Sequence, residues 1–125
     1  MNIQNEESRQ FDAFKQKTIA SLQDKKAEEI TTIDLRNLNN RLTDMFIICH
    51  GNSDKHVESI AENVEEQVHK AFREKPMVRE GFENKEWILL DYFDFVIHVF
   101  KEDKRSFYAL EELWGDGKVE KINHE

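Results

Sequence analysis

The sequence predicts an α/β fold, a two-layer domain in which helices pack on a mixed sheet of about four to five strands. The first observation is a pair of short, continuous apolar runs, Met45–Cys49 and Phe95–Phe100, which are typical of strands covered on both faces. The second is an apolar stripe at helical spacing over residues 57–72, between the two runs. The third is the length of 125 residues, which indicates a single domain, 1–125, with one core.

The region before the first apolar run predicts one helix and one strand. Apolar side chains recur at helical spacing over residues 4–23, which predicts an amphipathic helix. A polar connection follows over residues 24–29. Apolar and polar residues then alternate over residues 32–35, which predicts a half-buried strand.

The stretch after the first apolar run predicts the clearest helix in the chain. Ser53 can cap its N-terminus, and Asp54 is favourable beside the positive end of the helix. Pro76, the only proline, ends the region. The apolar stripe of this helix consists of Val57, Ile60, Ala61, Val64, Val68, Ala71 and Phe72.

The second half of the chain predicts a hairpin and a final short helix. Trp87–Leu90 and Phe95–Phe100 are two strong strand signals, and the stretch Asp91–Asp94 is short enough to form the turn between them. Apolar spacing over residues 107–114 indicates the last helix. Residues 116–125 are expected to form a flexible, frayed tail.

The composition favours a protein of the cytoplasm. Charged residues make up 35% of the chain and hydrophobic residues 38%, and nine Phe and two Trp argue against wholesale disorder. No apolar run approaches the length of a membrane span, and the polar segment Met1–Arg9 lacks the features of a secretion signal. The single Cys49 forms no disulfide framework, so we expect a reducing compartment.

Acidic residues are concentrated in the second half of the chain. The net charge is −8, and residues 80–125 hold 12 Asp/Glu against 6 Lys/Arg, a net of −6. Such a surface repels a phosphate backbone, which disfavours direct and specific nucleic-acid binding. It permits a basic protein partner, whose approach the acidity would steer. Acidity that serves solubility alone is the alternative explanation.

The residues that could carry chemistry are scattered. The five histidines show no metal-site spacing and the chain has no cysteine pair, so we expect no metal and no cofactor. Cys49 lies within an apolar run, where a thiol behaves as a small inert hydrophobe. We therefore expect no catalytic residue and no enzymatic activity.

One turn gives an enzymatic alternative. Gly51-Asn52-Ser53 joins a buried strand to a helix N-terminus, where free backbone N–H groups can bind an anion. It resembles the Gly-Ser turn of nucleotidyltransferases, which hold Mg²⁺ between two carboxylates on one strand face. Asp91 and Asp94 are three positions apart across a turn and need not converge. The turn is expected to be a helix cap, and a small Mg-dependent nucleotidyltransferase using Ser53, Asp91 and Asp94 is the alternative function.

An acidic and aromatic cluster is the candidate partner-binding site. Side chains alternate along a strand, so Trp87, Leu89 and Asp91 share one face of the sheet. Large aromatic residues bordered by charge are typical of interface anchors, and packing in the core is the alternative for each of them. The candidate residues are Trp87, Leu89, Asp91, Tyr92, Asp94, His98 and Tyr108.

Several ordered blocks of the sequence resemble one family. The segment Asp44–Ser53 resembles its D-x-F-V-I-x-T-G-x-S motif. The other matching positions are His56-Val57, Ile60-Ala61, Val64-Glu65, Glu80-Gly81, Glu86–Tyr92, Asp94, Val96–Phe100, Arg105, Tyr108, Leu110-Glu111 and Leu113–Gly115. The family is the Iojap-like ribosomal silencing factors, and the resemblance covers a ribosomal silencing factor domain at residues 11–118.

The resemblance implies a nucleotidyltransferase-like topology without known enzymatic activity. It also implies binding to the large ribosomal subunit through ribosomal protein L-fourteen, at the face that the small subunit joins. A protein on that surface sterically blocks subunit joining and represses translation in starvation or stationary phase. A homodimer of the free protein is also compatible with the sequence.

Two residues depart from the pattern of the family. His50 occupies a position where the family usually has a small hydroxyl residue. Phe93 replaces the glycine that usually lies between the two aspartates. Glycine there suggests a positive φ, which a Phe adopts only at a cost of about 1 kcal/mol. We therefore expect a rearranged turn.

Overall fold

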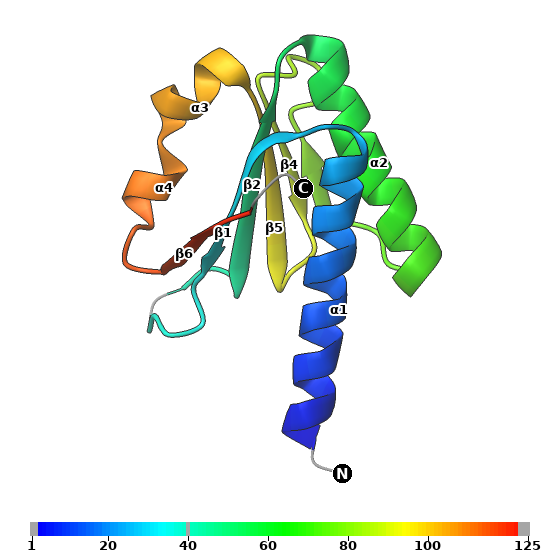
Figure 1. The fold of residues 1–125 in the computed structure, drawn as a ribbon, viewed down its shortest axis with the longest axis vertical. Coiled ribbons are helices and arrows are strands. Elements are labelled where there is room, and N and C mark those ends of the chain that lie inside the picture. The colour runs from blue at the N-terminus through cyan, green and yellow to red at the C-terminus, as the bar shows by residue number, and fades with distance from the viewer. Residues whose placement is uncertain (1–2, 40, 123–125) are drawn as a thin grey trace.

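A computed structural model describes residues 3–39 and 41–122 (Figure 1). Within these residues the helices and strands follow in the order α1 (Ile3–Asp24), β1 (Glu28–Asp34), β2 (Met45–Gly51), α2 (Asp54–Phe72), β3 (Val78–Glu80), β4 (Trp87–Asp91), β5 (Phe95–Lys101), α3 (Glu102–Tyr108), α4 (Leu110–Leu113) and β6 (Lys118–Lys121).

The strands form one mixed sheet in the order β3-β4-β5-β2-β1-β6. β2 and β5 run parallel at its centre, with Met45 opposite Phe95 and Gly51 opposite Lys101. The other neighbouring strands pair antiparallel, β4 and β5 as the predicted hairpin. Every residue of β2 is buried, as are all residues of β5 but the last. The two apolar runs therefore form strands covered on both faces, as predicted.

Two long helices cover one face of the sheet, which we call the covered face (Figure 1). α1 packs beside α2, and the helix predicted around the apolar stripe is confirmed as α2, which buries Val57, Ile60 and Val64. Ser53 is its N-cap, and the Ser53 Oγ accepts the backbone N–H of His56 at 3.1 Å. Both the amphipathic helix at the N-terminus and the cap thus match the sequence prediction.

The opposite face, which we call the open face, carries the two shorter helices α3 and α4 (Figure 1). A smaller core lies beneath them, and half-buried side chains border it at Leu38, Trp87, Leu89, Tyr108 and Trp114. Because α3 and α4 are short, this face is less completely covered than the other. The two faces of the sheet therefore differ in how much apolar surface they leave to solvent.

The α/β fold is confirmed, and several details differ from the sequence prediction. The sheet has six strands and not four to five, and helices lie on both of its faces and not in one layer. The segment predicted as a frayed tail contains β6, which pairs with β1, so the prediction is wrong for residues 118–121. The sequence did not predict β3 and β6. All their residues are exposed, so neither strand shows the alternation of apolar and polar residues by which a half-buried strand is predicted.

Two further segments differ. The strand predicted as half-buried, β1, is buried from Ile30 to Ile33, because β2 and β6 flank it and both faces are covered. The final helix is divided into α3 and α4 by Ala109, whose φ of 49° breaks the helical path. Within the described residues, no helix combines the length and the apolar character that crossing a membrane requires.

Candidate functional site

Trp87 is the central residue of the candidate site and lies half-buried on the open face. Its indole Nε1–H donates to His98 Nδ1 at 3.0 Å. Its ring lies 5.1 Å from that of Phe100 and 4.6 Å from that of Tyr108, measured between ring centroids. These contacts fix the indole in one orientation while part of it remains accessible. Such an arrangement is typical of a pre-oriented interface anchor.

His98 lies beneath the indole of Trp87 and is itself inaccessible to solvent. Only 3% of it is exposed, and the Phe46 ring packs against it edge-on with 4.7 Å between ring centroids. Its Nδ1 accepts the indole hydrogen, so the neutral ring carries its own hydrogen on Nε2. Burial lowers the pKa of His98 to about 3, which keeps the ring uncharged at neutral pH. His98 therefore positions Trp87 and has no surface to offer a partner directly.

Asp91 and Asp94 flank the β4–β5 turn, where β4 ends and β5 begins. Asp91 Oδ1 accepts the backbone N–H of Phe93 at 2.8 Å. Asp94 is exposed, and partial burial, followed by the nearby charge of Asp44, raises the pKa of its carboxyl. Neither of the two aspartates takes part in an ion pair among the described residues. Both carboxylates are therefore open to a cationic group from a partner.

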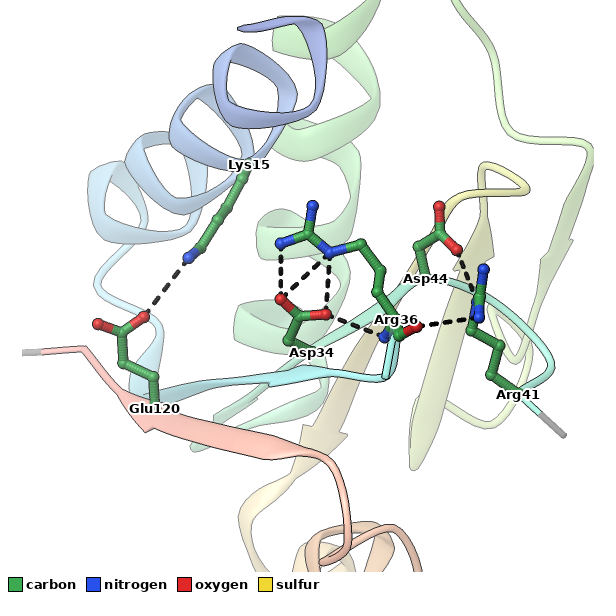
Figure 2. A network of polar contacts seen from close by, with 6 residues as sticks. All are labelled: Lys15, Asp34, Arg36, Arg41, Asp44 and Glu120. Atoms are coloured by element: carbon green, nitrogen blue, oxygen red, sulfur yellow. Dashed lines mark hydrogen bonds and ion pairs between the residues drawn. The ribbon is translucent and has the colours of Figure 1, made fainter. Parts of the chain in front are cut away.

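Nearby acidic residues differ from these two aspartates. Asp34 binds Arg36 through both carboxylate oxygens, and the shortest contact is 2.7 Å from Nη2 (Figure 2). The Arg36 hydrogen bond is the main cause that lowers the pKa of Asp34. Asp44 accepts from Arg41 Nε at 3.0 Å. These carboxylates are neutralised within the chain, whereas Asp91 and Asp94 have no ion-pair partner among the described residues.

Tyr92 does not share the surface of the other candidate residues. It lies on the covered face, 8% exposed, with its ring 5.2 Å from that of Phe14 between centroids. Burial raises the pKa of its hydroxyl. The structure thus brings Trp87, Leu89, His98 and Tyr108 together on the open face, places the two aspartates at the turn, and buries Tyr92 behind the sheet. Partner binding stays a prediction for Trp87, Leu89, Tyr108 and the two aspartates, whereas His98 is buried and positions Trp87.

The Gly51-Asn52-Ser53 turn is a helix cap whose N–H groups are partly bonded within the chain. The Asn52 N–H donates to His56 Nδ1 at 3.0 Å, and His56 Nε2 donates to the carbonyl of Lys25 at 2.7 Å. The Val57 N–H donates to the Ser53 carbonyl. The N–H groups of Asn52, His56 and Val57 are therefore bonded within the chain and are not available to an anion.

The residues of the enzymatic alternative do not converge. Ser53 follows the carboxyl end of β2, whereas the Asp94 carbonyl accepts the N–H of Met45 at the amino end of the same strand. A strand of seven residues separates these ends by about 20 Å. A Mg²⁺ ion held between Asp91 and Asp94 would thus be far from the Ser53 turn. Cys49 is fully buried, and burial raises the pKa of its thiol to about 12, so it is an unreactive thiol.

Sequence reasoning missed a buried polar cluster around Arg105. Its guanidinium donates to Glu111 Oε2 at 2.8 Å, to Thr31 Oγ1 at 3.1 Å and to His50 Nδ1 at 3.0 Å. The cluster connects α3 and α4 to β1 and β2, so it holds the shorter helices against the sheet. The only signal in the sequence was the departure of His50 from the small hydroxyl residue usual in the family.

The same cluster brings together three possible metal ligands, Glu28, His50 and Glu102, with atoms within 4.8 Å of one another. Arginine can only donate, so His50 Nδ1 accepts from Arg105 and the neutral ring carries its hydrogen on Nε2. Burial, followed by the charge of Arg105, lowers the pKa of His50. Nε2 therefore presents a hydrogen to Glu28, 3.6 Å away, and has no lone pair for a metal ion.

The known proteins that this chain resembles carry closely related descriptions. A sequence profile described as "Ribosomal silencing factor during starvation" matches residues 3–125. The chain is 44% identical over 101 residues to the ribosomal silencing factor of Bacillus subtilis, which covers 80% of this chain and 83% of that protein. It is 32% identical over 100 residues to the mitochondrial Iojap-related protein of Arabidopsis thaliana, which covers 74% of this chain and 52% of that protein.

Two solved structures share the fold. A crystal structure of a Chromobacterium violaceum protein superimposes with a TM-score of 0.76 at 30% identity, covering 92% of this chain and 88% of that one. A Bacillus halodurans protein superimposes with a TM-score of 0.71 at 33% identity, covering 86% of this chain and 94% of that one.

Proposed function

Because this chain belongs to the family of ribosomal silencing factors, we propose that it binds the large ribosomal subunit through ribosomal protein L-fourteen and sterically blocks joining of the small subunit. By this route it represses translation in the cytoplasm during starvation or stationary phase. The protein acts by occupying a surface and needs neither a cofactor nor a catalytic residue.

One observation carries this proposal: the open face ends at the β4–β5 turn, and the two carboxylates of this turn have no ion-pair partner among the described residues. Trp87 and Leu89 are half-buried on that face, and Trp87 is held in place by His98. Asp91 is the last residue of the same strand and Asp94 lies in the turn that follows, and neither has an ion-pair partner among the described residues. Apolar anchors bordered by free negative charge complement a protein surface that is both apolar and basic.

The charge distribution supports a protein and not an RNA as the binding partner. Residues 80–125 carry a net charge of −6, and they include β4, β5 and the turn between them. Approach of this region to ribosomal RNA is opposed by repulsion between its carboxylates and the phosphates. Ribosomal protein surfaces rich in Lys and Arg offer the opposite charge. The chain therefore needs no sequence-specific contact with nucleic acid.

The enzymatic alternative has no supporting observation in the structure. Ser53 and the aspartate pair lie at opposite ends of β2, and the N–H groups of Asn52 and Val57 are bonded within the chain. An enzyme of this type would bind a nucleotide in a Mg²⁺-dependent manner.

Co-sedimentation tests the proposal. The chain is mixed with isolated large subunits, without nucleotide, and pelleted through a sucrose cushion; we expect saturable binding. Isolated small subunits serve as the control and should leave the chain in the supernatant. The proposal would be wrong if the chain stayed in the supernatant with large subunits at every concentration, or if binding required Mg²⁺ and nucleotide together.

A further inference from the structure

The β4–β5 turn holds a phenylalanine in a backbone conformation that favours glycine. Phe93 has a φ of 76°, and the N–H of Asp94 donates to the carbonyl of Tyr92 at 3.0 Å. A hydrogen bond between residues two apart around a positive φ is a γ-turn of the rare, strained kind. Tyr92 N–H also donates to Phe95 O, so the hairpin loop consists of Phe93 and Asp94 alone. The first position of such a two-residue loop is one where glycine is preferred.

The strained conformation places the Phe93 side chain in solvent. The residue is 68% exposed, so its ring contributes little to the core of this chain. The backbone on both sides is fixed: Asp91 Oδ1 accepts the Phe93 N–H, and Thr43 Oγ1 donates to the Phe93 carbonyl at 2.6 Å. An aromatic ring is thus presented to solvent on a rigid backbone, at a cost in free energy that the fold alone does not require.

Other exposed apolar side chains gather at the same end of the sheet. Six large apolar residues are exposed within the described part of the chain, and four of them lie here: Leu42, Met77, Val78 and Phe93. Hydrogen bonds connect the segments that carry them. Met77 N–H donates to the carbonyl of Asp91, and Val78 is the register partner of Asp91 in the β3–β4 pair. Leu42 precedes Thr43, whose hydroxyl binds the carbonyl of Phe93.

Charge decides which kind of partner fits this end of the sheet. Asp91 and Asp94 lie on either side of the Phe93 position, and no cation pairs with them in the described residues, whereas Asp34 and Asp44 have Arg36 and Arg41. An apolar cluster with uncompensated carboxylates repels phosphate and attracts Lys and Arg side chains. It matches a protein surface in which an apolar depression is bordered by basic residues.

We propose that Phe93, with Leu42, Met77 and Val78 around it, is an apolar anchor that inserts into a depression bordered by basic residues on the ribosomal protein bound by the open face. This inference rests on the proposed function and extends its site to the end of the sheet. The Phe93 ring enters the depression, and Asp91 and Asp94 meet the basic groups at its border. The strain at Phe93 serves to hold the ring outward before the partner arrives, which reduces the conformational entropy lost on binding.

The substitution Phe93→Gly separates binding from folding. Glycine adopts a φ of 76° without strain, so the melting temperature should not fall and the hairpin should persist. Binding to isolated large subunits should nevertheless weaken at least tenfold in Kd, because the anchor is gone. Phe93→Asn, which also tolerates this φ but lacks the ring, should behave like the glycine variant. Phe93→Tyr keeps the aromatic body and should retain binding.

A matched control uses the other edge of the sheet. Val119 is 43% exposed on β6, the strand farthest from β3 in the sheet order, and Val119→Thr should bind as the unaltered chain does. Kd values for all five proteins are measured with the same large subunits by titration of a fluorescent label, beside thermal melts.

The possible outcomes test the role of Phe93 as an anchor separately from the proposed function. If the unaltered chain binds and Phe93→Gly and Phe93→Asn bind equally well, the anchor is wrong and the proposed function stands. If the unaltered chain itself fails to bind, the proposed function is wrong, and the proposal that Phe93 is an anchor is wrong as well. If both ring-less variants lose binding while isolated ribosomal RNA competes as well as the large subunit does, the partner is RNA, and the assignment to a protein surface is overturned.

Discussion

The covered face and the open face of the sheet carry similar apolar side chains but differ in how far these side chains are buried. On the covered face, Tyr92 and Phe95 are buried beneath α1 and α2, and Phe14 of α1 packs against both of them. On the open face, Trp87 and Leu89 keep part of their surface in solvent, because α3 and α4 are short. Trp87 and Tyr92 are only five positions apart. The helices above a strand face, and not the residue type, therefore decide whether an aromatic side chain is part of the core or is accessible to a partner.

The largest effect is expected when a residue of the covered face is truncated. Leu90 is fully buried there, and Leu90→Ala should lower the free energy of unfolding by about 2–5 kcal/mol, because a cavity remains in a close-packed core. Chemical denaturation measures this loss. The folded fraction should still bind large subunits with unaltered Kd. A normal free energy of unfolding combined with lost binding would assign Leu90 to the interface and reverse the roles of the two faces.

The buried histidine of the open face should make stability depend on pH. The pKa of His98 is lowered from 6.5 to about 3 in the folded chain by burial, so the unfolded chain binds the proton more readily. Stability should therefore be lost as the pH falls below 6.5, by up to about 1.4 kcal/mol per pH unit from this group.

The variant His98→Gln isolates this contribution. Glutamine can still accept from the Trp87 indole but does not titrate, whereas His50 and the carboxylates titrate equally in both proteins. The stability difference between the chain and the variant should shrink or change sign between pH 6.5 and 4. A difference that stays constant over this window would mean that His98 is not a buried neutral ring.

Truncation on the open face should affect binding directly. Trp87→Ala should weaken binding to the large subunit by about 2 kcal/mol or more, roughly 30-fold in Kd, if the half-exposed indole is an anchor. Some stability is also lost, about 1–3 kcal/mol, since His98 Nδ1 loses its donor. Titration well below the melting temperature separates the two effects. A folded variant with unaltered Kd would remove Trp87 from the interface.

The acidic turn should act mainly on the rate of association. Raising salt shortens the Debye length from about 10 Å at 0.1 M to about 3 Å at 1 M, so the on-rate should fall while the off-rate changes less. Replacing Asp91 and Asp94 with Asn should lower the on-rate about tenfold at low salt and flatten this dependence. The control replaces Asp24 and Asp103 with Asn at the opposite end of the sheet, where the on-rate should not change. An on-rate that is flat across the salt range would show that the acidity serves solubility.

The sequence predicted those parts of the molecule whose signal is local. The continuous runs of β2 and β5, the apolar stripe of α2 and the Ser53 cap each depend on neighbouring residues, and the structure confirms them. The positive φ that the glycine of the family suggests is also present at Phe93, so the expected rearrangement of the turn is wrong in this respect. β6 could not be predicted in the same way, because its residues are all exposed and it exists only through pairing with β1.

The candidate site was predicted in part, for a related reason. Alternation along β4 correctly placed Trp87 and Leu89 on one face and Tyr92 on the other. Which face the longer helices cover depends on the packing of the whole chain, so the sequence could not show that Tyr92 would be buried. The contacts of Arg105 with Thr31 and His50 join residues far apart in the sequence, and no spacing rule reveals them.

We infer that the open face and its turn occupy a surface that the small subunit needs. The most direct test of this inference adds the chain to separated large and small subunits and measures the yield of joined ribosomes by gradient centrifugation, without nucleotide. We expect the yield to fall in a saturable manner, with Trp87→Ala less effective and Val119→Thr as effective as the unaltered chain, while preformed translating ribosomes remain intact. An unchanged yield at saturating chain, or a reduction that appears only with nucleotide hydrolysis, would contradict the account.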